Sequence, residues 1–309
     1  MMKILLQFPE GLKQKAVEIA KKYEKKGDVV FLSAAPCYGA CDLALDEARA
    51  IGAKKIIHFG HSPFGNLKPK GSVKVEYINY AIDIDIEGLY AVLPYIEKYE
   101  KIALATTIQH IHQFEEMKKF FEKHGKKVFA GKGERASKIG QILGCDGRAV
   151  KKVEMKIDAV VFVGSGMFHQ LAVDIGPSNA QKPVFVYDPS GKTVQDIRPV
   201  IERIKKLRKG AIAAALEAKS FGILLSTKPG QFGLRAAEWA KKELNKRSFD
   251  ASILVANELQ PMAVKNFMNF DCYINTACPR MADDREVFGK PVLNIDMLKE
   301  VFKLLDQKE

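Results

Sequence analysis

The five cysteines carry the most specific chemistry in this chain, and they are scattered along it. Two lie four residues apart in 36-PCYGACD-42, directly after the apolar run VVFLSAA, and the others are Cys145, Cys272 and Cys278. A local zinc site would show CxxC pairs or a cluster of cysteine and histidine in the sequence, and neither surrounds Cys37 or Cys41. CxxxC is two-thirds of the CxxxCxxC signature of common radical enzymes, but the final cysteine is absent.

The elements that must position these thiols repeat three times along the chain. A buried strand, a turn and a helix are predicted from KILLQFPEGLKQKAVEIAKKY, KIALATTIQHIHQFEEMKKFFEKHG and FGILLSTKPGQFGLRAAEWAKKEL. In each case three further apolar runs follow at comparable spacings, although residue identities scarcely repeat. Apolar strands that alternate with helical patterns are typical of parallel sheets buried on both faces.

We therefore predict an α/β protein of three similar domains, each a small parallel sheet flanked by helices. Their expected bounds are residues 1–98, 99–208 and 209–309. The long helical pattern from Ile197 to Lys219 would lead from the second domain to the third.

Ligands of open parallel sheets collect at the carboxyl ends of the strands. Cys41, Cys145 and Cys278 each follow a predicted strand in a different domain. If the domains face one another around a pseudo-threefold axis, one thiol from each converges. Three thiolates suit an iron–sulfur cluster better than zinc, and a [4Fe–4S] cluster with three ligands leaves one iron open to a substrate. Cys37 and Cys272 are interpreted as small buried side chains.

Several short motifs then resemble a known family. They are LLQFPEGL, YGACD, 58-HFGHS-62, 106-TTIQHIHQ-113, 141-QILGCD-146, 163-VGSGMFH-169 and 277-ACPR-280. The same order is found in the archaeal diphthamide-biosynthesis enzymes, the 2-(3-amino-3-carboxypropyl)histidine synthases, and the similarity covers nearly the whole chain. In that family one cysteine per domain holds a [4Fe–4S] cluster. The matching residues are Cys41, Cys145 and Cys278, whereas Cys37 and Cys272 do not match.

The resemblance implies a noncanonical radical reaction. The open iron binds S-adenosylmethionine (SAM), and the reduced cluster donates one electron to the sulfonium. The bond to the 3-amino-3-carboxypropyl chain breaks, methylthioadenosine is released, and the carbon radical adds to C2 of a histidine imidazole on translation elongation factor 2. The family also implies a homodimer and a one-electron reductant.

Polar residues in the same loops are candidates for contact with SAM or the protein substrate. The loop from Thr106 to Gln109 is expected to open a helix whose N-terminal amides hold the SAM carboxylate. His110 is the candidate catalytic residue, and His112 is expected on a different helix face, which makes the two a poor joint metal site. The predicted cofactor contacts are Thr106, Thr107, Gln109, Gly164, Ser165, Gly166, Asp188 and Arg280.

Structural roles are alternatives for several of these side chains. His110 could cap or pack, Asp188 could cap a turn, and Arg280 could pair with an acid at a domain interface rather than with a ligand carboxylate. His58 and His61 could line the substrate entry or make structural hydrogen bonds.

Composition and charge limit the partners and the cellular location that we expect for this protein. The net charge of +12 suits an acidic partner, but the lysines are mostly mixed with glutamate in helical patterns, which indicates solvated helix faces. No aromatic-interleaved basic patch occurs, so direct nucleic-acid binding is not expected. No apolar run of about 18 residues occurs, and the N-terminal apolar run is too short for a signal peptide. We expect a cytoplasmic protein that does not contact membranes.

Two alternatives to the leading interpretation stay open at this point. Quinolinate synthase also has three similar α/β domains with one cluster cysteine in each, but it is a dehydratase and would not cleave SAM. A non-enzymatic binding module with inert thiols is the other. Nucleotide binding through 190-SGKT-193 is not expected, because Val186 stands where a P-loop requires its first glycine. The run 131-GKGERA-136 is excluded as a dinucleotide motif, because it follows the second predicted strand of its domain and not the first.

Overall fold

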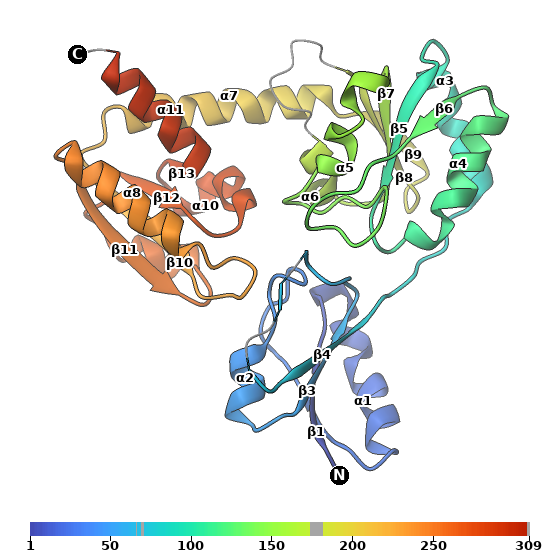
Figure 1. The fold of residues 1–309 in the computed structure, drawn as a ribbon, viewed down its shortest axis with the longest axis horizontal. Helices are drawn as coiled ribbons and strands as arrows, with labels where there is room; N and C mark the ends of the chain where they lie inside the picture. Colours follow the sequence, from blue (N-terminus) through green and yellow to red (C-terminus); the bar gives the residue numbers. More distant parts are fainter. Residues whose placement is uncertain (66, 69–70, 174–181, 308–309) are drawn as a thin grey trace. The chain divides into compact units, whose positions relative to one another are not determined.

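The computed structural model describes residues 1–65, 67–68, 71–173 and 182–307. The chain divides into two compact units, Met1–Arg198 and Pro199–Glu309. Three separate sheets form, one inside each predicted segment, which confirms the α/β class and the small parallel sheets flanked by helices (Figure 1). The unit boundary lies at the start of α7 (Arg198–Ala215), so the three-way partition and its pseudo-threefold axis stay predictions.

The first sheet has four parallel strands in the order β2-β1-β3-β4. Its strands are β1 (Lys3–Gln7), β2 (Val29–Leu32), β3 (Lys55–Phe59) and β4 (Lys74–Ile78). Successive residues of β1 point to opposite faces. Ile4 and Leu6 therefore pack towards α1 (Ala16–Glu24), whereas Leu5 packs with Ala48 of α2 (Leu45–Ala50). Both faces are covered, as the continuous apolar run predicts.

The second sheet has five strands in the order β6-β5-β7-β8-β9. They are β5 (Lys101–Thr106), β6 (Lys127–Phe129), β7 (Ala159–Val163), β8 (Val184–Asp188) and β9 (Thr193–Asp196). The last strand is antiparallel and was not predicted, because its sequence TVQD has no apolar run. Phe114, Met117 and Phe121 of α4 (Phe114–Lys123) pack against the sheet. Short helices complete this part: η2 (Ile86–Val92), α3 (Leu93–Ile96), α5 (Arg148–Lys151) and α6 (Met167–Gln170).

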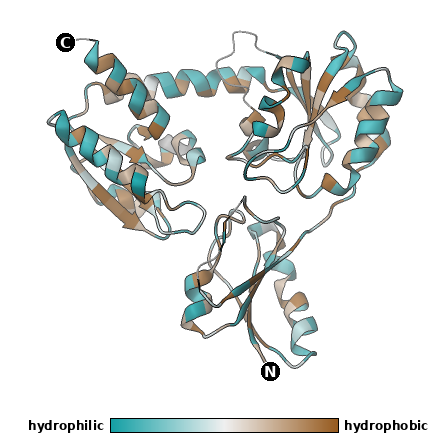
Figure 2. Cartoon of the chain, viewed as in Figure 1, coloured by the Kyte–Doolittle hydropathy of each residue, from teal (hydrophilic) through white to brown (hydrophobic). Residues whose placement is uncertain are grey.

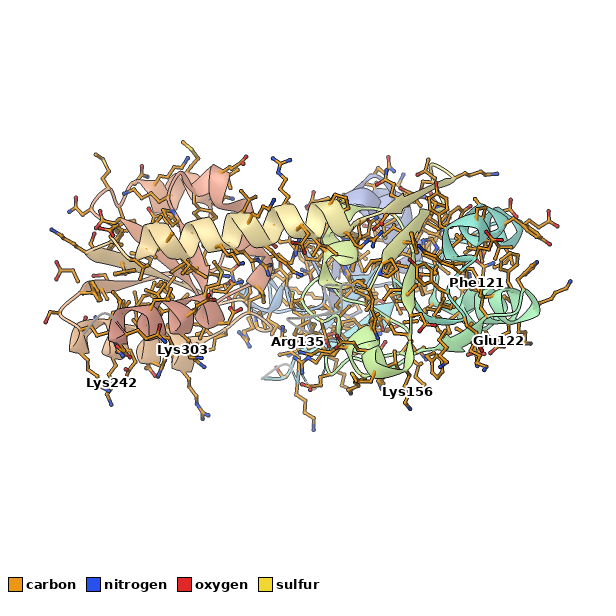
Figure 3. All side chains as sticks on the ribbon, turned by 90° about the horizontal axis from the view of Figure 1, so that it is seen from above. Phe121, Glu122, Arg135, Lys156, Lys242 and Lys303 are labelled. Carbon is orange, nitrogen blue, oxygen red and sulfur yellow. The ribbon has the colours of Figure 1, made fainter. Side chains whose placement is uncertain are left out.

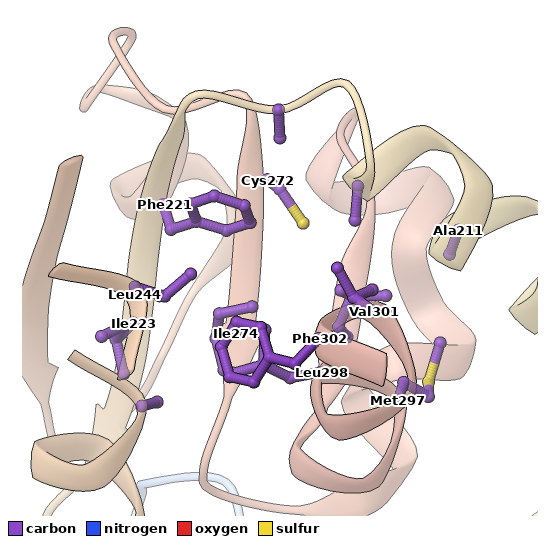
Figure 4. Packing of buried hydrophobic residues seen from close by; sticks show 14 of the residues in the cluster. Ala211, Phe221, Ile223, Leu244, Cys272, Ile274, Met297, Leu298, Val301 and Phe302 are labelled. Atoms are coloured by element: carbon purple, nitrogen blue, oxygen red, sulfur yellow. The ribbon is translucent and has the colours of Figure 1, made fainter. Parts of the chain in front are cut away.

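The third sheet, in the second compact unit, has four parallel strands in the order β11-β10-β12-β13. They are β10 (Ser220–Ser226), β11 (Asp250–Ala256), β12 (Cys272–Asn275) and β13 (Val292–Asn294). Its helices are α8 (Leu234–Lys246), α9 (Pro261–Lys265), α10 (Arg285–Phe288) and α11 (Ile295–Asp306). Cys272 is fully buried beside Phe221 and Ile274, facing the α11 side chains Val301 and Phe302 (Figure 4). The predicted packing role of Cys272 is confirmed.

The distribution of hydrophobic residues matches this arrangement of sheets covered by helices. The strands are mainly hydrophobic, while helices such as α4 and α8 carry both hydrophobic and hydrophilic residues (Figure 2). Lysines such as Lys156, Lys242 and Lys303 are exposed, and their side chains extend away from the ribbon (Figure 3). Within the described ranges, no helix combines the length and apolarity that a bilayer crossing requires.

Candidate functional site

Accessibility separates the five cysteines into two classes. Cys41, Cys145 and Cys278 are half-buried, whereas Cys37 and Cys272 are buried. All five lie within the described ranges, and none of them forms a disulfide. Each half-buried thiol follows a strand of a different sheet, as predicted: β2, β6 and β12.

The loop that carries Cys41 is fixed to the end of β1 by Gln7, which is 1% exposed. Gln7 Nε2 donates to the Asp42 carbonyl at 2.6 Å, and Gln7 Oε1 accepts from the Ala44 amide at 3.1 Å. The same Oε1 lies 2.9 Å from His58 Nδ1 at the end of β3. One buried amide therefore ties the Cys41 loop to two neighbouring strands.

These contacts assign the histidine tautomers. Because Gln7 Oε1 can only accept, His58 Nδ1 must donate, and a neutral His58 then accepts at Nε2. His61 Nδ1, 2.9 Å away, is the donor to that nitrogen. Burial lowers the pKa of His58 to about 3, with His61 adding to the effect. Burial likewise lowers the pKa of His61 to about 4, with His169 contributing. Both rings are therefore neutral at pH 7.

Cys145 lies at the tip of a tight turn. Leu143 and Asp146 exchange backbone hydrogen bonds of 3.2 and 2.9 Å across it. A Cβ on Gly144 would lie 2.0 Å from the Phe168 ring, and a Cβ on Gly147 would lie 1.7 Å from the Ala172 carbonyl oxygen. The glycines thus let the cysteine turn approach the segment that follows Gly166.

Asp146 anchors this turn from inside, with its side chain fully buried. Its Oδ2 accepts from the Arg135 amide at 2.6 Å, and its Oδ1 accepts from the Arg148 amide at 3.1 Å. The Arg148 guanidinium lies 3.4 Å from Oδ1 and also pairs with Glu134. Backbone donors and one cation satisfy the carboxylate, as a buried charge requires.

Two further contacts join loops of the first and second sheets. Gln141 Nε2 donates to Ser62 Oγ at 2.9 Å, and both residues are buried. Gln109 Nε2 donates to the Gly60 carbonyl at 3.0 Å. The HFGHS loop therefore contacts both TTIQHIHQ and QILGCD, and these motifs from distant parts of the sequence form one connected layer.

The TTIQHIHQ segment differs from its prediction. Thr106 is the last residue of β5, and α4 begins only at Phe114, after the 3-10 turn η3 (Ile111–Gln113). The expectation that Thr106–Gln109 opens a helix is wrong, because the His110 amide closes a turn onto the Thr107 carbonyl instead. Thr106 Oγ1 donates to the Val163 carbonyl at 2.6 Å, which gives this buried hydroxyl a structural partner.

One of the two ring nitrogens of His110 already has a hydrogen-bond partner. Its Nδ1 lies 2.9 Å from the Ile82 carbonyl, so Nδ1 donates and the neutral ring keeps its acceptor at Nε2. Burial lowers the pKa of His110, while the Ile82 carbonyl and Asp188 oppose that shift. His112 Nε2 instead lies 2.7 Å from Asp83 Oδ1. The two histidines therefore make separate contacts.

Gly164, Ser165 and Gly166 lie beside Asp188 at the carboxyl edge of the second sheet. Gly166 has a φ of 82°, which favours glycine, and a Cβ on Gly164 would lie 3.4 Å from the Thr107 methyl carbon. Asp188 Oδ1 accepts from Ser165 Oγ at 2.5 Å and from the Ser190 amide at 2.8 Å. Burial alone would raise the pKa of Asp188, but these hydrogen bonds outweigh it and lower the pKa.

In the second unit, Cys278 lies in a turn built by Asn275. Asn275 Nδ2 donates to the Cys278 carbonyl at 2.8 Å, and the Ala277 amide donates to Asn275 Oδ1 at 3.0 Å. Arg280 pairs with Asp283 at 2.8 Å, and Arg208 of α7 pairs with the same carboxylate. Arg280 thus makes an ion pair within its own unit.

Sequence reasoning missed four positioning residues, namely Gln7, Ser62, Asp146 and Gln141. Gln7 had a detectable signal, because a polar residue at the end of an apolar strand must find a buried partner. Asp146 directly follows Cys145 in the quoted motif QILGCD, which Gln141 begins. Their partners lie in other loops, which spacing alone does not show.

The chain is similar to known proteins over nearly its whole length. The 2-(3-amino-3-carboxypropyl)histidine synthase of Pyrococcus horikoshii is 36% identical over 99% of this chain and 86% of its own length. The enzyme of the same name from Methanocaldococcus jannaschii is 30% identical over 97% of this chain and 84% of its own length. The crystal structure of Dph2 from Pyrococcus horikoshii with a 4Fe-4S cluster superposes with a TM-score of 0.88 at 35% identity, covering 98% of this chain and 86% of that one. The family model described as putative diphthamide synthesis protein matches residues 8–308, and the chain belongs to this diphthamide synthesis family.

Proposed function

We propose that this protein catalyses the first step of diphthamide biosynthesis. It transfers the 3-amino-3-carboxypropyl group of SAM to C2 of a histidine imidazole on translation elongation factor 2, and methylthioadenosine is the second product. Family membership and the names of the relatives support this proposal. The observation that carries it is the difference in burial among the cysteines, since the three half-buried thiols are those that follow strands of three different sheets.

Cys41, Cys145 and Cys278 would hold a [4Fe–4S] cluster. The donor set fits, because thiolates are the ligands that iron–sulfur clusters use, and each of the three thiols lies in a loop rather than in a core. When bound, the cluster supplies one electron and one open coordination position for SAM. Gln7, Asp146 and Asn275 fix the three cysteine loops through hydrogen bonds to their backbone.

The edge of the second sheet would bind the remainder of SAM. Asp188 uses Oδ1 for Ser165 and for backbone amides, and no hydrogen bond to its Oδ2 is found among the described residues. This oxygen can accept from the SAM ammonium group or from ribose hydroxyls. Gly164 and Gly166 allow a ligand to approach the backbone closely, and Thr107 borders the same turn. His110 Nε2 is a candidate contact for SAM or for the target imidazole.

The protein substrate and the assembly follow from the same proposal. The net charge of +12 favours encounter with an acidic surface of elongation factor 2, and this steering would weaken as salt increases. We also propose a homodimer, an external one-electron reductant and a cytoplasmic location.

The test is an anaerobic reaction with dithionite, elongation factor 2 and SAM labelled in the aminocarboxypropyl chain. Label should enter the factor with an equal amount of methylthioadenosine, and a factor whose target histidine is replaced should stay unlabelled. Formation of 5′-deoxyadenosine instead would contradict the proposed bond cleavage. A quinolinate synthase-like dehydratase or a binding module would give neither nucleoside product.

A further inference from the structure

Cys37 is buried, as the sequence predicts, but its neighbours include two histidines. One ligand atom from each of Cys37, His58 and His61 lies within 4.8 Å of the other two. Cys37 is 3% exposed and His58 is fully buried. Ligand atoms of one tetrahedral zinc ion, at about 2.0–2.3 Å from the metal, lie roughly 3.3–3.8 Å from one another. The most widely spaced of these atoms therefore need to approach one another only slightly to share a single ion.

We propose that Cys37, His58 and His61 form a second metal site, which takes a borderline-soft divalent cation of the zinc class. One thiolate and two imidazole nitrogens suit zinc, whereas magnesium and calcium prefer oxygen ligands. The site uses none of the cysteines assigned to the iron–sulfur cluster. Three protein ligands leave a fourth position for water or another small ligand.

Gln7 supplies the hydrogen bond that a metal-binding His58 needs on its other ring nitrogen. Metal-bound histidines usually donate their other ring N–H to a fixed acceptor, which holds the ring and selects the ligating nitrogen. His58 Nδ1 donates to Gln7 Oε1 at 2.9 Å, so Nε2 is the nitrogen left to bind the ion. Gln7 is itself held by the Asp42 carbonyl and the Ala44 amide. His58 thus has the orientation and tautomer of a metal ligand.

The rearrangement on binding is small. His58 Nε2 and His61 Nδ1 are 2.9 Å apart and share one proton. The ion would take the place of that proton, which moves from His61 Nδ1 to Nε2 as the His61 ring changes tautomer. The two rings would separate by roughly half an ångström to reach zinc-bound spacing. The Cys37 thiol loses its proton on binding, so the affinity rises with pH. The bound ion would link the loop of Cys37 and Cys41 to β3, in addition to the link that Gln7 makes.

Metal content of the anaerobically purified protein gives the first test. We expect about one zinc per chain beside the iron, with Cys37→Ser losing the zinc and keeping the iron. Cys272→Ser is the matched control, because it removes another buried thiol and should keep both metals. If the cluster proposal fails, the purified protein lacks iron but keeps its zinc. If the zinc proposal fails, the protein keeps its iron and lacks zinc. The two failures are therefore distinguishable.

Cobalt binding tests the ligands directly. The full chain with Cys41, Cys145 and Cys278 all changed to serine is stripped of metal and titrated with Co²⁺. We expect one thiolate-to-cobalt charge-transfer band, lost in this background on adding Cys37→Ser or Cys37→Ala. His58→Gln and His61→Gln should weaken Co²⁺ binding at least a hundredfold, and Gln7→Ala by about ten- to a hundredfold. Circular dichroism identifies variants that fail to fold. No cobalt band in the parent, or a band unchanged by both Cys37 substitutions, would overturn the site.

Discussion

Gln141 Nε2 donates to Ser62 Oγ at 2.9 Å, and this bond joins the loop of Cys145 to the histidine loop of the first sheet. Gln141 is fully buried, and its Oε1 accepts from the Ser137 amide, the Ser137 hydroxyl and the Lys138 amide. The amide thus has every polar atom paired. It sets the spacing between two motif loops that are separated by about 80 residues in the sequence.

Replacing Gln141 should loosen this junction. Gln141→Ala leaves the buried Ser62 hydroxyl and the Ser137 amide without their partner, which we expect to reduce the free energy of unfolding by about 1–3 kcal/mol. Denaturant titration of the purified protein measures this. Gln14→Ala, at an exposed glutamine, is the control and should change stability by less than about 0.5 kcal/mol. Equal stability of the two variants would show that the junction is unimportant.

The two glycines around Cys145 should differ in their tolerance of alanine. A Cβ on Gly147 meets a backbone oxygen that cannot move aside, whereas a Cβ on Gly144 meets the half-exposed Phe168 ring. We expect Gly147→Ala to cost at least about 3 kcal/mol and Gly144→Ala about 1–2 kcal/mol. Gly11→Ala has no atom near its Cβ and serves as control. The reverse order in thermal unfolding would contradict the packing described here.

Asp188 should determine SAM affinity. Asp188→Asn keeps the size of the side chain but removes the charge that faces an ammonium or hydroxyl group. Loss of a hydrogen bond to a charged group costs about 1.5–3 kcal/mol, which corresponds to a weakening of SAM binding by about ten- to a hundredfold. Isothermal titration with the cluster-containing protein measures this. Asp250→Asn, on an exposed strand residue, should bind SAM normally. Unchanged binding by Asp188→Asn would remove Asp188 from the SAM site.

Cys272 should resist alkylation at alkaline pH. Burial raises its pKa to about 12, so it stays a thiol at pH values where an ordinary cysteine ionises, near 8.5. Because the unfolded thiol ionises first, the stability that this group contributes is present below pH 8.5 and is lost as the pH rises towards 12. Iodoacetamide at pH 9 should label Cys41, Cys145 and Cys278 in metal-free protein, with mass spectrometry as the readout. Rapid labelling of Cys272 in folded protein would contradict its placement.

The sequence pattern predicted the strands of the three sheets, because parallel strands buried on both faces appear in a sequence as continuous apolar runs. Twelve strands were identified this way, from β1 to β8 and from β10 to β13, while the polar β9 was missed. The same pattern predicted that Cys41, Cys145 and Cys278 follow strands of three different sheets. The late start of α4 was not predictable, since it depends on a turn that His110 closes onto Thr107. The contacts of Gln7 and Gln141 were also out of reach, because they depend on how distant loops meet.

The central claim is that three thiols from three sheets hold one cluster. Iron and sulfide per chain, measured after anaerobic purification of each single Cys→Ala variant, test it most directly. The account predicts loss of the cluster with Cys41→Ala, Cys145→Ala and Cys278→Ala, and a full complement of cluster iron with Cys37→Ala and Cys272→Ala. Full iron in any of the first three variants, or its loss with Cys272→Ala in a folded protein, would contradict it.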